Sequence, residues 1–135
     1  MADLFAYGTL MAPQVFQLIT NLKASSSAAK LRGFRRFSFE GQCYPGIMPA
    51  NAGDCVEGLL YADIPPQFWP QLDKYESYVY ERKEVRVQTP KGENTVAETY
   101  IVRPAYRHLL SDDEWDFDEF VSNHLARYLA RTDLK

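Results

Sequence analysis

Two short segments of this chain carry residue types that can do chemistry together. Residues 5–10 (FAYGTL) are an apolar stretch that runs into a glycine, and residues 72–76 (LDKYE) end in a carboxylate. Gly8 has no Cβ, so the backbone can turn closely there, and consecutive N–H groups can bind a carboxylate or a developing oxyanion. An anion site beside a single acid, Glu76, indicates proton transfer on a small zwitterionic substrate. The plainer interpretation of the same residues is a tight turn and a solvated glutamate.

Glu76 is the candidate acid and base of such a site. The helix before it is expected to end close by, where the helix dipole disfavours the ionised carboxylate and raises its pKa. Four aromatic residues flank it in the sequence and would add desolvation: Trp69, Tyr75, Tyr78 and Tyr80. A raised pKa allows a carboxyl group to exchange protons near neutral pH.

Three further residues are assigned supporting roles. Asp73 lies one helical turn before Glu76, and we expect it to hold local structure by accepting hydrogen bonds from the backbone or from Arg82. Tyr100 is the tyrosine expected near the site, where its hydroxyl can bond a polar group of the substrate. Arg82 is a second candidate for positioning the substrate.

The composition excludes several other classes of function. The net charge of −3 and the scattered basic residues argue against a nucleic-acid partner. No apolar run approaches membrane-spanning length, and the first residues lack the basic region of a secretory signal, so we expect a cytosolic protein. The two histidines and two cysteines have no metal-binding spacing, and no nucleophile-elbow, phosphate-loop or dinucleotide motif is present. We therefore expect neither a metal nor an organic cofactor.

The periodicity predicts one α+β domain over residues 1–135, compatible with a small barrel. Strands are expected over 4–7, 31–39 and 56–64, and a hairpin over 81–87 and 95–102. A helix of about ten residues follows Pro13, and a second one holds Pro70 in its first turn. Residues 24–29 are expected to form a surface loop and residues 41–53 an irregular loop.

The last segment predicts the clearest helix, over about 112–131. Its apolar residues keep a 3.6-residue period: Phe117, Phe120, Val121, His124, Leu125, Tyr128 and Leu129. Ser111 and Glu114 have the spacing of a capping box, which would start the helix. His124 lies on the apolar stripe and is expected to be a buried core position.

Taken together, these motifs resemble those of the γ-glutamylcyclotransferase-like superfamily, in the branch of plant avirulence-induced gene proteins. The FAYGTL segment corresponds to the family's YG[ST]L turn, residues 44–47 (YPGI) to its Tyr-Pro loop, and residues 56–61 (VEGLLY) to a strand motif. The LDKYE segment, with the residues from Tyr80 to Val87, is similar to the stretch that carries the catalytic glutamate. One departure is Ser77, where the family often has glycine.

This resemblance implies a small mixed β-barrel flanked by helices, with a C-terminal helix. It implies that Tyr7, Gly8, Thr9 and Leu10 hold the glutamyl end of a small γ-glutamyl substrate, and that Glu76 is the general acid and base. The implied reaction cyclises a γ-glutamyl amide to 5-oxoproline and releases the amine, without a cofactor.

Two other hypotheses remain open at this point. The same pocket could serve a non-catalytic ligand-binding module, or the C-terminal helix could dock onto a partner protein. The leaving amine is not specified by the sequence: glutathione, a γ-glutamyl amino acid, a γ-glutamyl-lysine isopeptide and a γ-glutamyl-amine all fit. The oligomeric state is likewise not predicted.

Overall fold

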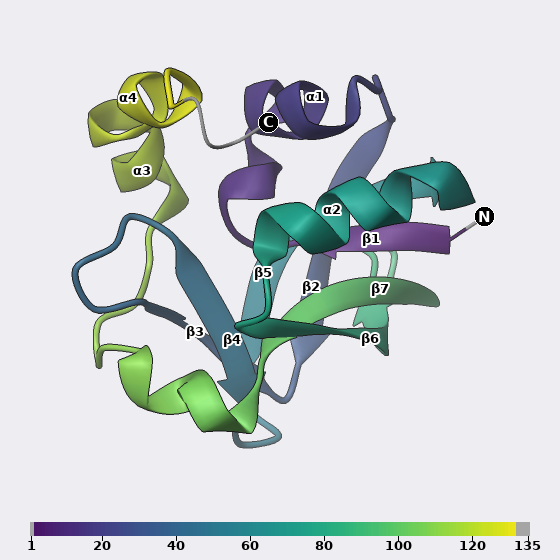
Figure 1. Cartoon of the computed structure of the whole chain (residues 1–135). Helices are drawn as coiled ribbons and strands as arrows, with labels where there is room; N and C mark the ends of the chain where they lie inside the picture. Colours follow the sequence, from purple (N-terminus) through teal and green to yellow (C-terminus); the bar gives the residue numbers. More distant parts are fainter. Residues whose placement is uncertain (1, 132–135) are drawn as a thin grey trace.

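The computed structural model describes residues 2–131, and its centre is a closed five-stranded barrel (Figure 1). The strands follow the order β1-β5-β2-β6-β7 around the barrel. Their bounds are Ala2–Ala6 for β1, Cys55–Ile64 for β5, Ser26–Arg32 for β2, Tyr80–Gln88 for β6 and Asn94–Val102 for β7. All neighbours pair antiparallel except β1 and β7, whose parallel contact closes the barrel. The sheet is therefore mixed.

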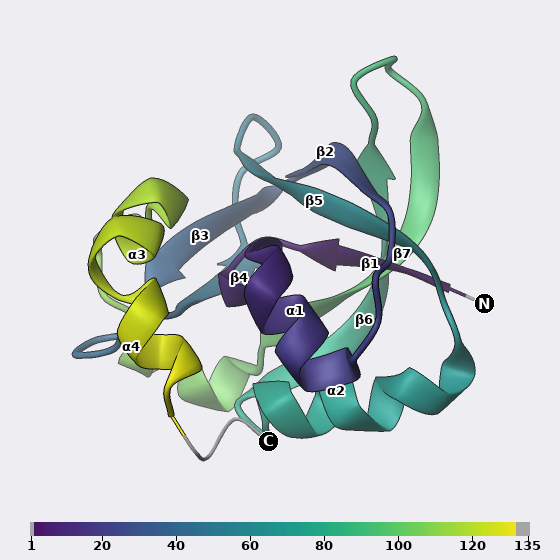
Figure 2. The ribbon, with the colours of Figure 1, turned by 90° about the horizontal axis from the view of Figure 1, so that it is seen from above.

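The remaining elements lie around this barrel. A separate two-stranded sheet joins β3 and β4, and helices cover the ends of several strands (Figure 2). The bounds are Phe34–Ser38 for β3, Pro45–Pro49 for β4, Pro13–Thr20 for α1, Trp69–Glu76 for α2, Phe117–Asn123 for α3 and Leu125–Leu129 for α4. Three short 3₁₀ helices are η1 (Thr9–Met11), η2 (Pro66–Phe68) and η3 (Pro104–Leu109). Within residues 2–131, no helix is long and apolar enough to cross a bilayer.

Alternation along β1 divides the core into two clusters. Phe5 points into the barrel, where it packs with Val56 and Val87. Its neighbour Leu4 points to the other face and packs under the helices with Phe16. Because successive strand residues face opposite sides, one short strand supplies both clusters and ties the helices to the barrel. The chain that leaves β1 is thus held firmly just before Gly8.

Several predicted elements are confirmed. The first strand, the helix that begins at Pro13, the strand over 56–64 and the hairpin of β6 and β7 all form, and Pro70 lies in the first turn of α2. The predicted domain spans 1–135, of which residues 1 and 132–135 lie outside the described part.

Two loop predictions are wrong. Most of the 24–29 segment belongs to β2, which pairs with β5 from Ser26↔Tyr61 to Arg32↔Cys55. The 41–53 segment contains β4, which pairs with β3. Small, polar or proline-containing segments have weak strand propensity, and here the backbone of a neighbouring strand decides their conformation.

The C-terminal helix is also shorter than predicted. It begins at Phe117 rather than near 112, and it breaks at His124 into α3 and α4. The expected capping box is absent among the described residues. The Ser111 hydroxyl accepts from the Asp113 N–H at 3.2 Å and donates to the Ser38 carbonyl at 3.0 Å, and Glu114 pairs with Arg35. His124 is not a core residue: its side chain is 38% exposed and lies 3.1 Å from Glu119.

The apolar stripe of this segment packs on its own chain. Phe120, Leu125 and Tyr128 are all buried within the cluster that lies under the helices. Trp115, just before α3, is buried there as well. Most of the predicted stripe is therefore covered by the protein itself, although Val121 is 40% exposed, and this packing does not support a docking role for the C-terminal helix.

Candidate active site

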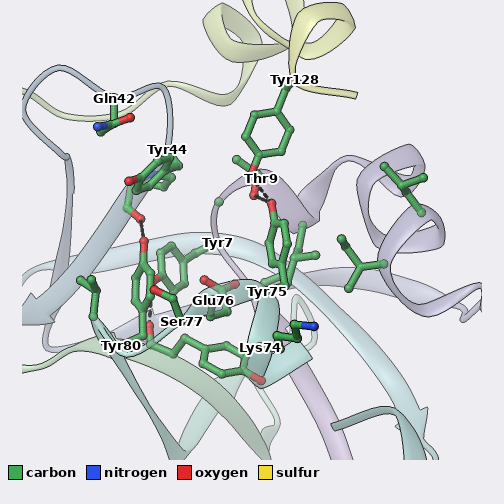
Figure 3. A pocket seen from close by; sticks show the side chains of 18 of the residues that line it. Tyr7, Thr9, Gln42, Tyr44, Lys74, Tyr75, Glu76, Ser77, Tyr80 and Tyr128 are labelled. Carbon is green, nitrogen blue, oxygen red and sulfur yellow. Dashed lines mark hydrogen bonds between the residues drawn. The ribbon is translucent and has the colours of Figure 1, made fainter. Parts of the chain in front are cut away.

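A cavity of about 1150 Å³ lies where the end of β1 meets α1, α2 and α4 (Figure 3). Its lining comes from segments that are far apart in the sequence, including Tyr7, Gln42, Glu76 and Tyr128. Tyr7, Gly8, Thr9, Leu10 and Glu76 all line it, as the sequence predicts for a shared site. The two motifs at 5–10 and 72–76 are therefore brought together by the fold.

Glu76 is the last residue of α2, and its carboxyl group faces this cavity between Tyr7 and Tyr75 (Figure 3). Leu72 and Trp69, both buried, anchor the helix that carries it. The carboxyl forms no hydrogen bond or ion pair with any other residue in the described part of the chain. Burial, and secondarily the negative charge of Asp73, raises the pKa of Glu76 to about 8. The group can therefore gain or lose a proton near neutral pH.

Helix α2 ends at Glu76, and the backbone turns sharply at the next residue, Ser77. The Ser77 N–H donates to the Asp73 carbonyl at 3.0 Å and closes the last turn. Ser77 itself has φ 77° and ψ −177°, a conformation that is found almost only at glycine. Ser77 thus occupies the glycine-type turn despite its side chain, at a cost of about 1–3 kcal/mol.

The turn after β1 leaves three consecutive N–H groups unused. The carbonyls of Gly8 and Thr9 accept hydrogen bonds from Met11 and Ala12, at 2.9 and 3.1 Å. The N–H groups of Gly8, Thr9 and Leu10 donate to no other described residue. We call these three groups the anion cradle, because unpaired N–H groups in sequence are suited to bind a carboxylate or an oxyanion.

Gly8 is required in this turn for a steric reason. A Cβ at this position would lie 2.8 Å from Cγ of Pro45 and 3.0 Å from its Cδ. Pro45 begins β4, whose backbone pairs with β3, so it has little room to move. The contact between the first motif and the Tyr-Pro loop thus explains the glycine by close approach.

The two predicted positioning residues take different places. Tyr100 lines the cavity, but its hydroxyl donates to Asp73 Oδ1 at 2.6 Å. Arg82 does not line this cavity; its guanidinium lies 3.5 Å from Asp73 and 4.6 Å above the ring of Trp69. Both residues hold Asp73, which confirms the structural role predicted for that carboxylate.

A chain of hydroxyl groups in the cavity wall was not foreseen from the sequence. Thr9 Oγ1 lies 2.6 Å from the Tyr75 hydroxyl, which in turn hydrogen-bonds the Tyr128 hydroxyl (Figure 3). Burial raises the pKa of Tyr75 and of Tyr128, so both stay protonated. The sequence places Tyr75 beside Glu76 and so indicates that Tyr75 lies near the site. Its hydrogen bond with Tyr128 of α4 depends on the tertiary fold and has no sequence signal.

No group of three or more histidine, cysteine, aspartate or glutamate side chains within residues 2–131 is arranged to hold a metal ion. The available chemistry is that of one titratable carboxyl, an anion cradle and neutral hydroxyl groups. This set supports proton transfer and the binding of an anionic substrate.

The comparisons with known proteins agree with this architecture. The family model described as "Gamma-glutamyl cyclotransferase, AIG2-like" matches residues 4–117, and the chain belongs to this family. AIG2-like protein C of Arabidopsis thaliana is 36% identical over 96% of this chain and 75% of its own length. AIG2-like protein D of the same plant is 33% identical, over 98% and 87% respectively.

Solved structures show the same fold. A solution structure from Arabidopsis thaliana has a TM-score of 0.73 and 26% identity, and the match covers 95% of this chain and 85% of that one. A structure titled "Gamma-glutamyl cyclotransferase" has a TM-score of 0.65 at 22% identity, over 76% and 66% of the two chains, and supports the fold alone. The predicted family and the predicted mixed barrel flanked by helices are confirmed.

Proposed function

We propose that this protein is a γ-glutamyl cyclotransferase in which Glu76 is the general acid and base. The observation that carries the proposal is the unpaired carboxyl of Glu76 in the cavity, with its pKa raised to about 8. The family to which the chain belongs supports the reaction type. The substrate is a γ-glutamyl amide, and the products are 5-oxoproline and an amine.

The reaction is an intramolecular aminolysis. The Glu76 carboxylate takes a proton from the α-ammonium group of the substrate, and the nitrogen lone pair attacks the γ-carbonyl carbon. A new C–N bond closes the five-membered lactam. The C–N bond to the leaving amine then breaks as Glu76 returns its proton to that nitrogen. The second proton on the ring nitrogen passes to the released amine, so the products are the neutral lactam and an ammonium ion. Both reacting groups belong to one molecule, so the protein needs only to select the folded rotamer.

The pKa of Glu76 suits both halves of this cycle. The α-ammonium group of a γ-glutamyl amide lies beside a free carboxylate, so it is more basic than a peptide α-amino group, whose pKa is about 8. The raised pKa of Glu76 brings the carboxyl closer to it in basicity. Transfer of the proton from the ammonium to Glu76 therefore costs less free energy than transfer to a carboxylate of ordinary pKa, which favours acid–base catalysis. A carboxylate with an ordinary pKa would be a much weaker base toward the α-ammonium group.

The anion cradle would bind the negatively charged part of the substrate. The N–H groups of Gly8, Thr9 and Leu10 can hold either the α-carboxylate or the oxyanion that develops on the γ-carbonyl. Tyr7 lines the cavity but does not donate a hydrogen bond to the substrate, because its hydroxyl already donates to the Tyr100 carbonyl at 2.6 Å. Tyr100 and Arg82 act indirectly, by holding Asp73.

The test is direct product detection with the purified protein. A panel of γ-glutamyl amides that differ only in the leaving amine is incubated with it, and 5-oxoproline is measured by mass spectrometry. Formation of 5-oxoproline is expected, and the preferred member of the panel identifies the leaving group. Ligand binding without product across the panel would contradict the proposal and favour a non-catalytic binding module.

A further inference from the structure

The peptide bond between Tyr7 and Gly8 has a guanidinium group on one side. Nη1 of Arg36, a residue of β3, donates to the Tyr7 carbonyl at 2.7 Å and to the Glu57 carbonyl at 3.0 Å. The carbonyl and the N–H of a trans peptide point in opposite directions. The Gly8 N–H, the first donor of the anion cradle, therefore points away from Arg36.

We propose that Arg36 is a positioning residue of the anion cradle. Its guanidinium fixes the orientation of the Tyr7–Gly8 peptide and polarises it, so that the Gly8 N–H is a stronger donor toward an anionic group bound in the cavity. This inference rests on the cradle assigned under the proposed function. Arg36 does not itself line the cavity, so it acts through the peptide and not by touching the substrate.

The energetic argument depends on the charge of the donor. A hydrogen bond from a cation is about twice as strong as a neutral one, and a polarised peptide passes part of that effect to its own N–H. Anion binding at an N–H whose carbonyl faces a cation is thus favoured over binding at an isolated peptide. Arg36 can therefore strengthen the Gly8 N–H as a donor through the peptide bond, although its own side chain does not enter the cavity.

Arg36 is held in place from several sides. Its guanidinium lies 5.5 Å from the ring of Trp115, and the Trp115 indole N–H donates to the Cys43 carbonyl at 2.8 Å. Burial lowers the pKa of Arg36, and the charges of Glu114, Glu57 and Asp116 oppose this shift by favouring its charged form. An arginine stays protonated under such conditions. The cation is therefore fixed by an aromatic face behind it and by two carbonyls in front.

A purely structural role would predict a different outcome. β1 and β5 pair up to Ala6↔Leu59, and Arg36 bridges the two backbone segments just beyond that point. If the bridge only joined the two strands, its loss would lower stability and leave the donor strength of the Gly8 N–H unchanged. The two roles are separated by observing the Gly8 amide itself.

The test uses Arg36→Met, which keeps an unbranched side chain and removes the charge and both donors. The matched control is Arg35→Met, since Arg35 is the exposed neighbour that pairs with Glu114. In the ligand-free protein we expect the amide nitrogen resonance of Gly8 to move upfield in Arg36→Met and to stay in place in the control. For cyclisation we expect kcat/KM to fall about tenfold to a hundredfold, the loss typical of a displaced positioning group.

Wild-type Gly8 resonance and wild-type kcat/KM in folded Arg36→Met would overturn the inference. If Arg36→Met does not fold, Arg36→Lys decides, because a point charge without the planar fork does not replace arginine at such a site. Arg36→Lys should give a smaller upfield shift and an intermediate kcat/KM, and wild-type values for both would overturn the inference. If the wild type forms no 5-oxoproline, the proposed function fails, while the Gly8 shift in ligand-free protein still tests Arg36.

Discussion

The buried carboxyl of Glu76 should make the protein less stable as the pH rises. In the folded protein its pKa is about 8, against an ordinary value of 4.5. The folded state therefore binds this proton more tightly than the unfolded chain does. A raised pKa of this kind contributes stability that is complete below about pH 4.5 and is lost as the pH rises through about 8.

The magnitude follows from the two pKa values. Relative to the fully protonated protein, the loss is about 1 kcal/mol at pH 5, about 3 kcal/mol at pH 7 and about 5 kcal/mol at pH 9. Glutamine has the shape of the protonated acid and does not titrate. The Glu76→Gln variant should therefore become progressively more stable than the wild type as the pH is raised, although it removes the proposed catalytic group.

Urea unfolding at about pH 5, 7 and 9 measures this difference directly. The free energy of unfolding of Glu76→Gln minus that of the wild type should grow by about 2–3 kcal/mol between pH 5 and pH 7. Glu93→Gln, in the exposed turn between β6 and β7, is the matched control for removing a carboxylate. Parallel stability curves for Glu76→Gln and the wild type would show that Glu76 is not desolvated and would refute the reasoning.

Four further predictions address the rest of the site. The value of kcat/KM for cyclisation should increase with pH up to about 8, where Glu76 becomes a carboxylate, and a flat profile would contradict its role as base. Ser77→Gly should raise the free energy of unfolding in urea by about 1 kcal/mol, because it relieves a glycine-type conformation; a lower value would show that the turn is not strained. Gly8→Ala should lower that free energy by about 1–3 kcal/mol, since its Cβ would meet Pro45 at 2.8 Å, whereas Gly53→Ala points into open space and should be nearly neutral. Tyr128→Phe should lower it by about 1 kcal/mol through loss of the hydroxyl chain, and no change would mean that this chain contributes nothing.

The two motifs that line the candidate site were predictable because each is continuous in the sequence. A glycine after an apolar strand and a carboxylate at a helix end keep their local geometry wherever the fold places them. The start of α1 at Pro13 and the β6–β7 hairpin were predictable for the same reason. In each case a local preference agrees with the final structure.

Features that depend on distant partners were not accessible in this way. β2 is strand because β5 pairs along it, and β4 is strand because β3 does. Arg82 and Tyr100 lie opposite each other across β6 and β7, so both reach Asp73, a register that no local pattern reveals. The roles of Arg36 and Tyr128 likewise appear only when the fold brings them to the turn after β1.

The central claim is that Glu76 moves the proton during cyclisation. The most direct measurement compares 5-oxoproline formation by the wild type, Glu76→Gln and Glu93→Gln on the best γ-glutamyl amide of the panel. We expect Glu76→Gln to stay folded and to lose at least about a hundredfold in kcat, while Glu93→Gln retains wild-type activity. Wild-type turnover by folded Glu76→Gln would show that this residue does not move the proton and would remove it from the mechanism.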